Sequence, residues 1–132
     1  MINASLKVFA MNGYAHASTD DIVREAGISK GLLFHYFVSK LGLYSFIYDY
    51  SIRYVILELT TGVDKEETDY FRLVGQIREA ELQVMRNYPC MMLFLNNSRL
   101  ENVSEVLLET EDKRNILSEK YAQILSQATG EE

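Results

Sequence analysis

Apolar residues recur at steps of three and four along nearly the whole chain, and this spacing constrains the fold more than any other feature of the sequence. The alternation of apolar and polar residues that is typical of half-buried strands is missing, and one proline, Pro89, interrupts the pattern. The chain has 132 residues, 48% of them hydrophobic, which is enough for one core or at most two. We therefore predict an all-α protein.

Residues that start and stop helices divide this pattern into seven predicted helices. Gly13 and Gly27 follow apolar runs and suit the left-handed conformation that ends a helix, whereas Ser18 and Ser29 can cap the next helix through their hydroxyl oxygens. Pro89 suits the first turn of a short helix. The predicted helices cover residues 2–12, 18–27, 29–37, 40–60, 67–87, 89–95 and 103–127, with loops at 60–65 and 96–98.

Residues 18–40 predict two short helices joined by a turn that contains Gly27. The second helix begins with Ser29, Lys30 and Gly31, which supply a hydroxyl, a cation and a position without a side chain. In a DNA-reading helix-turn-helix, the start of the second helix meets base edges in the major groove, and its free amides favour a phosphate oxygen. The segment therefore predicts a helix-turn-helix that reads DNA, because its polar and basic groups fall on outward positions; the alternative is a packing unit that binds no DNA.

Further along the same short helix, the residue types suit contacts to a duplex. Leu32 can touch a thymine methyl group, and His35 and Tyr36 are donors, although an ordinary exposed helix position accounts for His35 equally well. Leu33 and Phe37, one turn apart, are suited to hold the helix against its neighbours. Lys40, at the start of the next helix, can reach the sugar-phosphate backbone.

Charge is distributed unevenly along the chain. Residues 1–44 hold four basic and three acidic residues, a net charge of +1, whereas the remainder holds nine basic and sixteen acidic residues, a net charge of -7. Because a polyanion is repelled by the acidic part, any phosphate-binding surface has to lie in the first third of the chain.

Several classes of function find no support in the sequence. The lone cysteine, Cys90, cannot form an internal disulfide, and His16 and His35 are the only histidines, so we expect no metal and no cofactor. Lys7 interrupts the apolar run near the N-terminus, and no stretch approaches an uninterrupted run of about 18 apolar residues. No catalytic triad, paired carboxylates or phosphate-binding glycine loop can be found. We predict a cytoplasmic protein that is not an enzyme.

Tyrosines and methionines are frequent after residue 45. In most helical proteins such residues form ordinary core, and this reading is the simpler one; the alternative is an apolar cavity for a small-molecule effector. Glu81 interrupts an apolar stripe and is either solvated at an edge or placed to attract a cationic ligand. The candidate ligand-binding residues are Tyr48, Tyr54, Ile77, Glu81, Tyr88, Met91, Met92 and Phe94.

Two segments, INASLKVFAMNGY at residues 2–14 and STDDIVREAGISKGLLFHYFVSK at residues 18–40, resemble the N-terminal domain of the tetracycline-repressor (TetR) family of transcriptional regulators. The resemblance covers about the first 45 to 50 positions. It implies that Lys40 falls on a phosphate-contacting lysine, and that Phe34 stands where many members have a tyrosine that donates to phosphate, so that contact is lost here. The DNA-binding residues that it implies are Ser18, Thr19, Ser29, Lys30, Gly31, Leu32, Phe34, His35, Tyr36 and Lys40.

The resemblance also implies an organisation and a function. We expect a helix-turn-helix DNA-binding domain at residues 1–45, followed at residues 46–132 by a helical body for effector binding and dimerisation. The usual basic N-terminal arm and the usual dimerisation helices are expected to be missing. The expected function is that of a ligand-responsive repressor whose homodimer binds a pseudo-palindromic operator in double-stranded DNA. The alternative is a helical module for ligand or protein binding that does not bind DNA.

Overall fold

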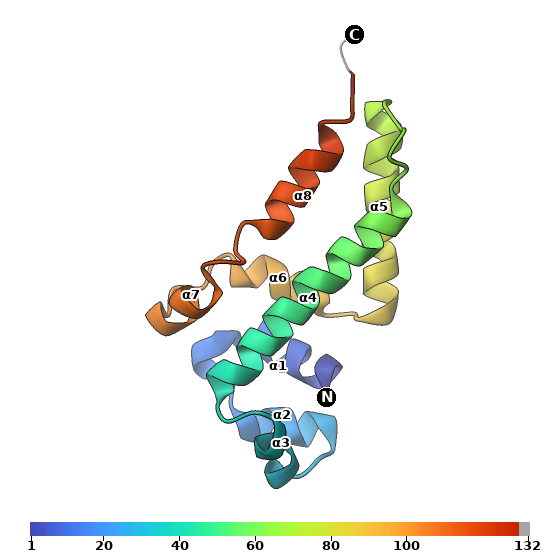
Figure 1. Cartoon of the computed structure of the whole chain (residues 1–132). Helices are drawn as coiled ribbons and strands as arrows, with labels where there is room; N and C mark the ends of the chain where they lie inside the picture. The colour runs from blue at the N-terminus through green and yellow to red at the C-terminus, as the bar shows by residue number, and fades with distance from the viewer. Residues whose placement is uncertain (130–132) are drawn as a thin grey trace.

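The structure, a computed structural model, describes residues 1–129 and is helical throughout, with no strand in that range. This confirms the predicted all-α fold. No helix within this range is both long and apolar enough to cross a membrane. The helices are α1 (Ile2–His16), α2 (Thr19–Ala26), α3 (Lys30–Tyr36), α4 (Lys40–Gly62), α5 (Tyr70–Asn87), α6 (Met91–Ser98), α7 (Ser104–Thr110) and α8 (Ile116–Leu125) (Figure 1).

Local capping interactions set the ends of the first helices, as predicted. The Ser18 hydroxyl accepts a hydrogen bond from the Asp21 amide at 3.0 Å, and Gly27 ends α2 in the left-handed conformation with φ of 68° and ψ of 31°. The Arg24 guanidinium, followed by the Ser18 hydroxyl, lowers the pKa of the Asp21 carboxyl below its ordinary value. Ser29 caps α3 in the same way, by accepting from the amide of Leu32 at 3.1 Å.

The first helix differs from its prediction. Gly13 has a positive φ of 75°, as expected of a stop, but its ψ of 169° is extended rather than left-handed helical. Helical hydrogen bonding resumes after this kink and α1 ends at His16, four residues later than residue 12. A glycine is suited to this position because positive φ is strained for residues that carry a Cβ atom.

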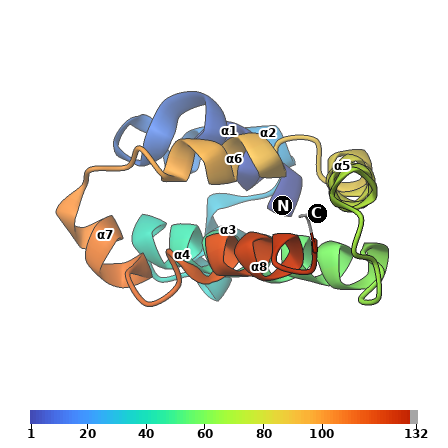
Figure 2. The same ribbon diagram turned by 90° about the horizontal axis from the view of Figure 1, so that it is seen from above.

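One hydrophobic core joins the N-terminal helices to the rest of the molecule. Phe9 of α1 is almost fully buried, and the centre of its ring lies 5.1 Å from the ring centre of Tyr44 in α4 and 6.3 Å from that of Phe94 in α6. Seen from above, α1 and α6 form one side and α4 and α8 the other, with α5 and α7 at the two ends (Figure 2). The long helix α4 therefore links the α1–α3 unit directly to the body.

The predicted helix over residues 103–127 is wrong, because the chain forms two helices, α7 and α8, with a turn at residues 111–115. Two half-buried basic side chains at this turn have partners elsewhere in the protein. Lys113 pairs with Asp49 at 3.3 Å, and Arg114 donates to the carbonyl of Ser98 at 3.0 Å. Both contacts lie between residues far apart in the sequence, so the helical spacing of apolar residues continues across the turn without revealing it.

Four further boundaries differ from the prediction. The Asp69 carboxylate accepts from the amide of Arg72 at 3.0 Å, so α5 begins at Tyr70 rather than at residue 67. Pro89 lies before α6 rather than in its first turn, and α4 continues two residues further than predicted, to Gly62. The predicted loop at residues 96–98 is helical instead, and Asn97 there donates to the carbonyl of Ala10 at 2.9 Å.

Candidate nucleic-acid interface

The third helix presents nearly all of its side chains to solvent. Leu33 is only 1% exposed and fixes α3 on the core, whereas Leu32, Phe34 and Tyr36 are 45%, 41% and 67% exposed. Ser29, Lys30, Gly31 and His35 are also exposed. A helix of seven residues that buries one side chain leaves the rest available for a large partner.

The orientation of α3 is set by contacts at its two ends. At its start, the amide of Ile28 donates to the carbonyl of Val23 at 3.1 Å, which closes the turn after α2. At its end, the ring of Phe37 lies 5.2 Å from that of Phe46 in α4. Together with buried Leu33, these contacts hold the outward face in a fixed position relative to α4.

The cations near this face are already engaged by carboxylates. Each such exposed pair contributes little to stability, because water competes for both charges. A DNA phosphate can therefore replace Asp20 as the partner of Lys30 at small cost. The pairs are Lys30–Asp20 at 2.8 Å, Arg24–Asp21 at 2.9 Å and Lys7–Glu25 at 3.1 Å.

The remaining predicted contacts differ in their surroundings. Ser18 and Thr19 are half-buried at the start of α2, and the Ser18 oxygen is engaged in capping, although its hydroxyl proton can still be donated. The rings of His35 and Tyr36 pack edge to face with their centres 5.0 Å apart, so these two side chains form one exposed aromatic pair.

Lys40 has local partners inside the protein. Its ammonium donates to the carbonyl oxygens of Tyr14 at 2.8 Å, Ala17 at 3.1 Å and Ala15 at 3.5 Å, and lies 4.4 Å from the centre of the Tyr14 ring. All three ammonium protons thus have acceptors in the last turn of α1 and at Ala17, which follows it. Lys40 holds the start of α4 against this turn, and its contact to phosphate stays a prediction.

Three of the candidate ligand-binding residues meet at a cavity of about 740 Å³ in the body. Tyr48, Glu81 and Met92 all line it, from α4, α5 and α6 respectively. The other lining residues are Ile52, Met85, Leu95, Asn96, Ser98, Arg99, Arg114, Asn115, Leu117, Ser118 and Tyr121.

The other five candidate ligand-binding residues lie outside this cavity. Met91, Phe94 and Ile77 are buried and belong to the hydrophobic core. The rings of Tyr54 and Tyr88 meet edge to face at 4.9 Å. For these five, the reading as ordinary packing accounts for the positions that the structure gives them.

Tyr54 and Tyr88 form a separate aromatic cluster with Tyr50. The hydroxyls of Tyr50 and Tyr88 share a hydrogen bond, and Tyr54 donates to the Glu58 carboxylate at 2.6 Å. The bond from Tyr88, together with burial, raises the pKa of Tyr50 to about 12. The hydroxyls in this cluster satisfy one another or a neighbouring carboxylate, so they stabilise the contact between α4 and the end of α5.

Among the lining residues that were not predicted from the sequence, Tyr121 and Arg114 form polar contacts with residues distant in the chain. Tyr121 donates to the Glu81 carboxylate at 2.6 Å, so Glu81 is half-buried and bonded rather than solvated. Arg114 donates to the Ser98 carbonyl at 3.0 Å and to the Thr110 hydroxyl at 3.3 Å. No spacing rule relates residues 40 or 16 positions apart, so the sequence contains no signal for these pairs.

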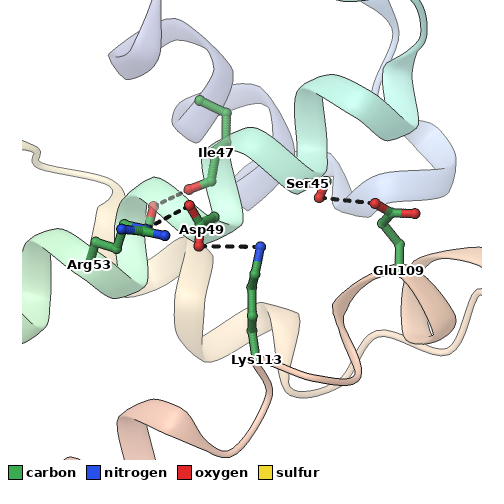
Figure 3. A network of polar contacts seen from close by, with 7 residues as sticks. Ser45, Ile47, Asp49, Arg53, Glu109 and Lys113 are labelled. Atoms are coloured by element: carbon green, nitrogen blue, oxygen red, sulfur yellow. Dashed lines mark hydrogen bonds and ion pairs between the residues drawn. The ribbon is translucent and has the colours of Figure 1, made fainter.

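The segment from α7 to the start of α8 also contacts α4. Figure 3 shows Ser45 and Asp49 pointing toward this segment, where the Ser45 hydroxyl donates to Glu109 at 3.4 Å and Lys113 pairs with Asp49 at 3.3 Å. Arg53 holds the same Asp49 carboxylate from the next turn of α4 at 2.8 Å. The wall of the cavity that contains Arg114 is therefore connected to the helix that follows α3.

Comparison with known proteins assigns the N-terminal part of the chain. The family model described as "Bacterial regulatory proteins, tetR family" matches residues 1–45, which are α1 to α3 and the start of α4. The uncharacterized HTH-type transcriptional regulator YuxN of Bacillus subtilis (strain 168) is 36% identical over 87 residues. That alignment covers 63% of this chain but 30% of the relative, so the chain spans less than a third of that protein's length. Residues 1–45 are therefore similar to the N-terminal domain described by the model of the tetR family of bacterial regulatory proteins.

Proposed function

We propose that this chain is the DNA-binding and effector-sensing part of a transcriptional regulator, and that α3 reads double-stranded operator DNA. The observation that supports this most directly is the outward face of α3, where only Leu33 is buried, within the segment that the family model matches. The proposed contacts combine base edges near the start of α3 with phosphates around it.

The start of α3 is suited to close approach. Gly31 lies in its first turn and leaves the backbone accessible, while the free amides there favour a phosphate oxygen. Lys30 can exchange Asp20 for a phosphate or accept a guanine as its partner. Exposed Leu32 can contact a thymine methyl group.

The proposed regulator acts as a homodimer and a repressor. Two copies would present their α3 helices about 34 Å apart, one turn of duplex, to a pseudo-palindromic operator. An effector in the 740 Å³ cavity that favours another distance between the two α3 helices weakens DNA binding. By reciprocity, DNA weakens effector binding by the same factor. Helix α4 is suited to transmit this coupling, because Lys40 lies at its start and Tyr48 and Ile52 line the cavity.

A second connection runs from the cavity through α7. Arg114 lines the cavity, and Lys113 beside it pairs with Asp49 of α4. At the start of α7, Glu105 accepts a hydrogen bond from the hydroxyl of Tyr14, in the last turn of α1, at 3.2 Å. The segment thus contacts α4 and α1 at once, and a shift of its position reaches the α1–α3 unit by two routes.

Salt-dependent binding to duplex DNA tests the proposal. We expect the chain to bind a random-sequence duplex with an affinity that falls steeply as salt rises, because phosphate neutralisation releases counterions. Replacing Lys30 by glutamine should reduce the slope of log affinity against log salt by about one, and should also change the sequences selected from a random duplex library if Lys30 reads a base.

Lys65 provides a matched control for this experiment. It is exposed in the loop between α4 and α5, so Lys65→Gln changes the net charge by the same amount away from α3. The proposal predicts no change of slope for this control. Binding that ignores salt, or equal effects of both substitutions, would instead favour a helical module that does not use α3 to bind DNA.

A further inference from the structure

The lining of the 740 Å³ cavity combines apolar and charged side chains. Its apolar lining comes from Ile52, Met85, Met92, Leu95 and Leu117. Its charged residues are Arg99, Arg114 and Glu81, the last of which is bonded to Tyr121. A ligand that fills this space is therefore amphipathic, and the charge of its polar group depends on the balance of these charges.

The Glu81 carboxylate accepts a hydrogen bond from one neutral donor. Tyr121 donates a hydrogen bond to Glu81 at 2.6 Å, and Tyr121 itself is half-buried. Burial, and then the bond to Glu81, raise the pKa of the Tyr121 hydroxyl, so it stays a neutral donor at physiological pH. The lining contains two guanidinium groups, Arg99 and Arg114, against the single carboxylate of Glu81, a net charge of +1. This charge favours an anion over the cation that the sequence alone allowed at Glu81.

The Arg114 guanidinium has no opposite charge beside it. Half-buried Arg114 donates to two neutral acceptors, Ser98 and Thr110, and has no carboxylate within 4.0 Å among residues 1–129. Its neighbour Lys113, by contrast, has a carboxylate partner in Asp49. Partial burial of a guanidinium without an opposite charge is unfavourable, and an anion that enters the cavity offsets that cost.

The interior also responds to this charge. Burial raises the pKa of Tyr48 in the cavity wall, whereas the nearby Arg114 opposes that rise. Burial, followed by Glu101 and Tyr48, raises the pKa of Tyr44, and Arg114 opposes that rise as well.

We propose that this cavity binds an amphipathic anion, with the anionic group on Arg114 and the apolar body along Met85, Met92 and Leu117. The proposal rests on the effector-sensing function proposed above and names the chemical class of its effector. The recognised chemistry is one carboxylate, sulfonate or phosphate group attached to an apolar chain or ring system.

Two fluorescent probes that differ in one charged group test this directly. Anilinonaphthalene sulfonate and phenylnaphthylamine share a ring system, but only the first has an anionic group. We expect the full chain to bind the sulfonate about tenfold more tightly, and Arg114→Gln to remove that advantage while leaving affinity for the neutral probe unchanged. The matched control is Arg78→Gln, an exposed arginine of α5 outside the cavity, which should leave both affinities as they are.

Two further measurements locate the site and test the sign of the ligand charge. Met92→Trp, which fills the cavity, should weaken both probes, and decanoate should displace the sulfonate probe at concentrations where decylamine does not. The proposal would be overturned by any one of three results: equal affinities for the two probes, displacement by decylamine in preference to decanoate, or probe binding that Met92→Trp leaves unchanged. DNA binding is measured separately on the same samples, so loss of salt-dependent DNA retention with anion preference intact would count against the DNA-reading function alone.

Discussion

Replacing Gly31 by alanine is expected to weaken DNA binding by about thirtyfold, equivalent to about 2 kcal/mol, without harming the fold. A Cβ atom built at Gly31 meets nothing within 4 Å, so the substitution causes no clash inside the protein. Because alanine is favoured over glycine inside a helix, the free energy of unfolding should rise by about 0.5–1 kcal/mol. The added methyl group instead occupies the space into which a DNA backbone or base edge would fit. Thermal unfolding and a duplex titration measure the two effects on one sample.

Gly75 supplies the matched control. It also lies inside a helix, α5, and a Cβ atom added there meets nothing within 4 Å. Gly75→Ala should therefore give a similar gain in stability and leave DNA affinity unchanged. If Gly31→Ala binds duplex DNA as tightly as the unmodified chain, the start of α3 does not approach DNA closely and the proposed docking is incorrect.

The parts of the fold that were predicted correctly depend on interactions between residues close in the sequence. Ser18 and Ser29 each bond an amide three residues later, and Gly27 acts at its own position. Such signals can be read without knowledge of the tertiary structure. The outward position of the α3 side chains follows for the same reason, because one buried leucine, Leu33, fixes which face of a short helix is turned inward.

The body could be predicted only in part, because its arrangement depends on contacts between distant residues. Tyr48, Glu81 and Met92 do meet at one cavity, but Arg114 reaches it only because the chain turns between α7 and α8. The apolar spacing of residues 103–127 continues through that turn and indicated one helix. Met91 was predicted as a ligand-binding residue, but the structure buries it fully in the core.

Lys40 can both stabilise the fold and contact a DNA phosphate, and one substitution tests the two roles. Replacing it by methionine removes the donor for the Tyr14, Ala15 and Ala17 carbonyls while keeping most of the apolar stem. Losing a charged donor to these acceptors should lower the free energy of unfolding by about 2 kcal/mol, which for a chain of this size corresponds to roughly 6–10 °C in Tm. Lys65→Met, at an exposed loop position, is the control and should leave Tm nearly unchanged.

The same variant separates the two roles of Lys40 when DNA binding is measured well below its lowered Tm. A phosphate contact predicts that the slope of log affinity against log salt falls by about 0.9, since one neutralised phosphate is lost. If Tm falls but the slope does not, Lys40 acts on DNA only by holding the start of α4 against the turn after α1. The ammonium can exchange its longest bond, to the Ala15 carbonyl at 3.5 Å, for a phosphate oxygen and keep the shorter bonds to Tyr14 and Ala17. We therefore expect both the Tm and the salt slope to fall.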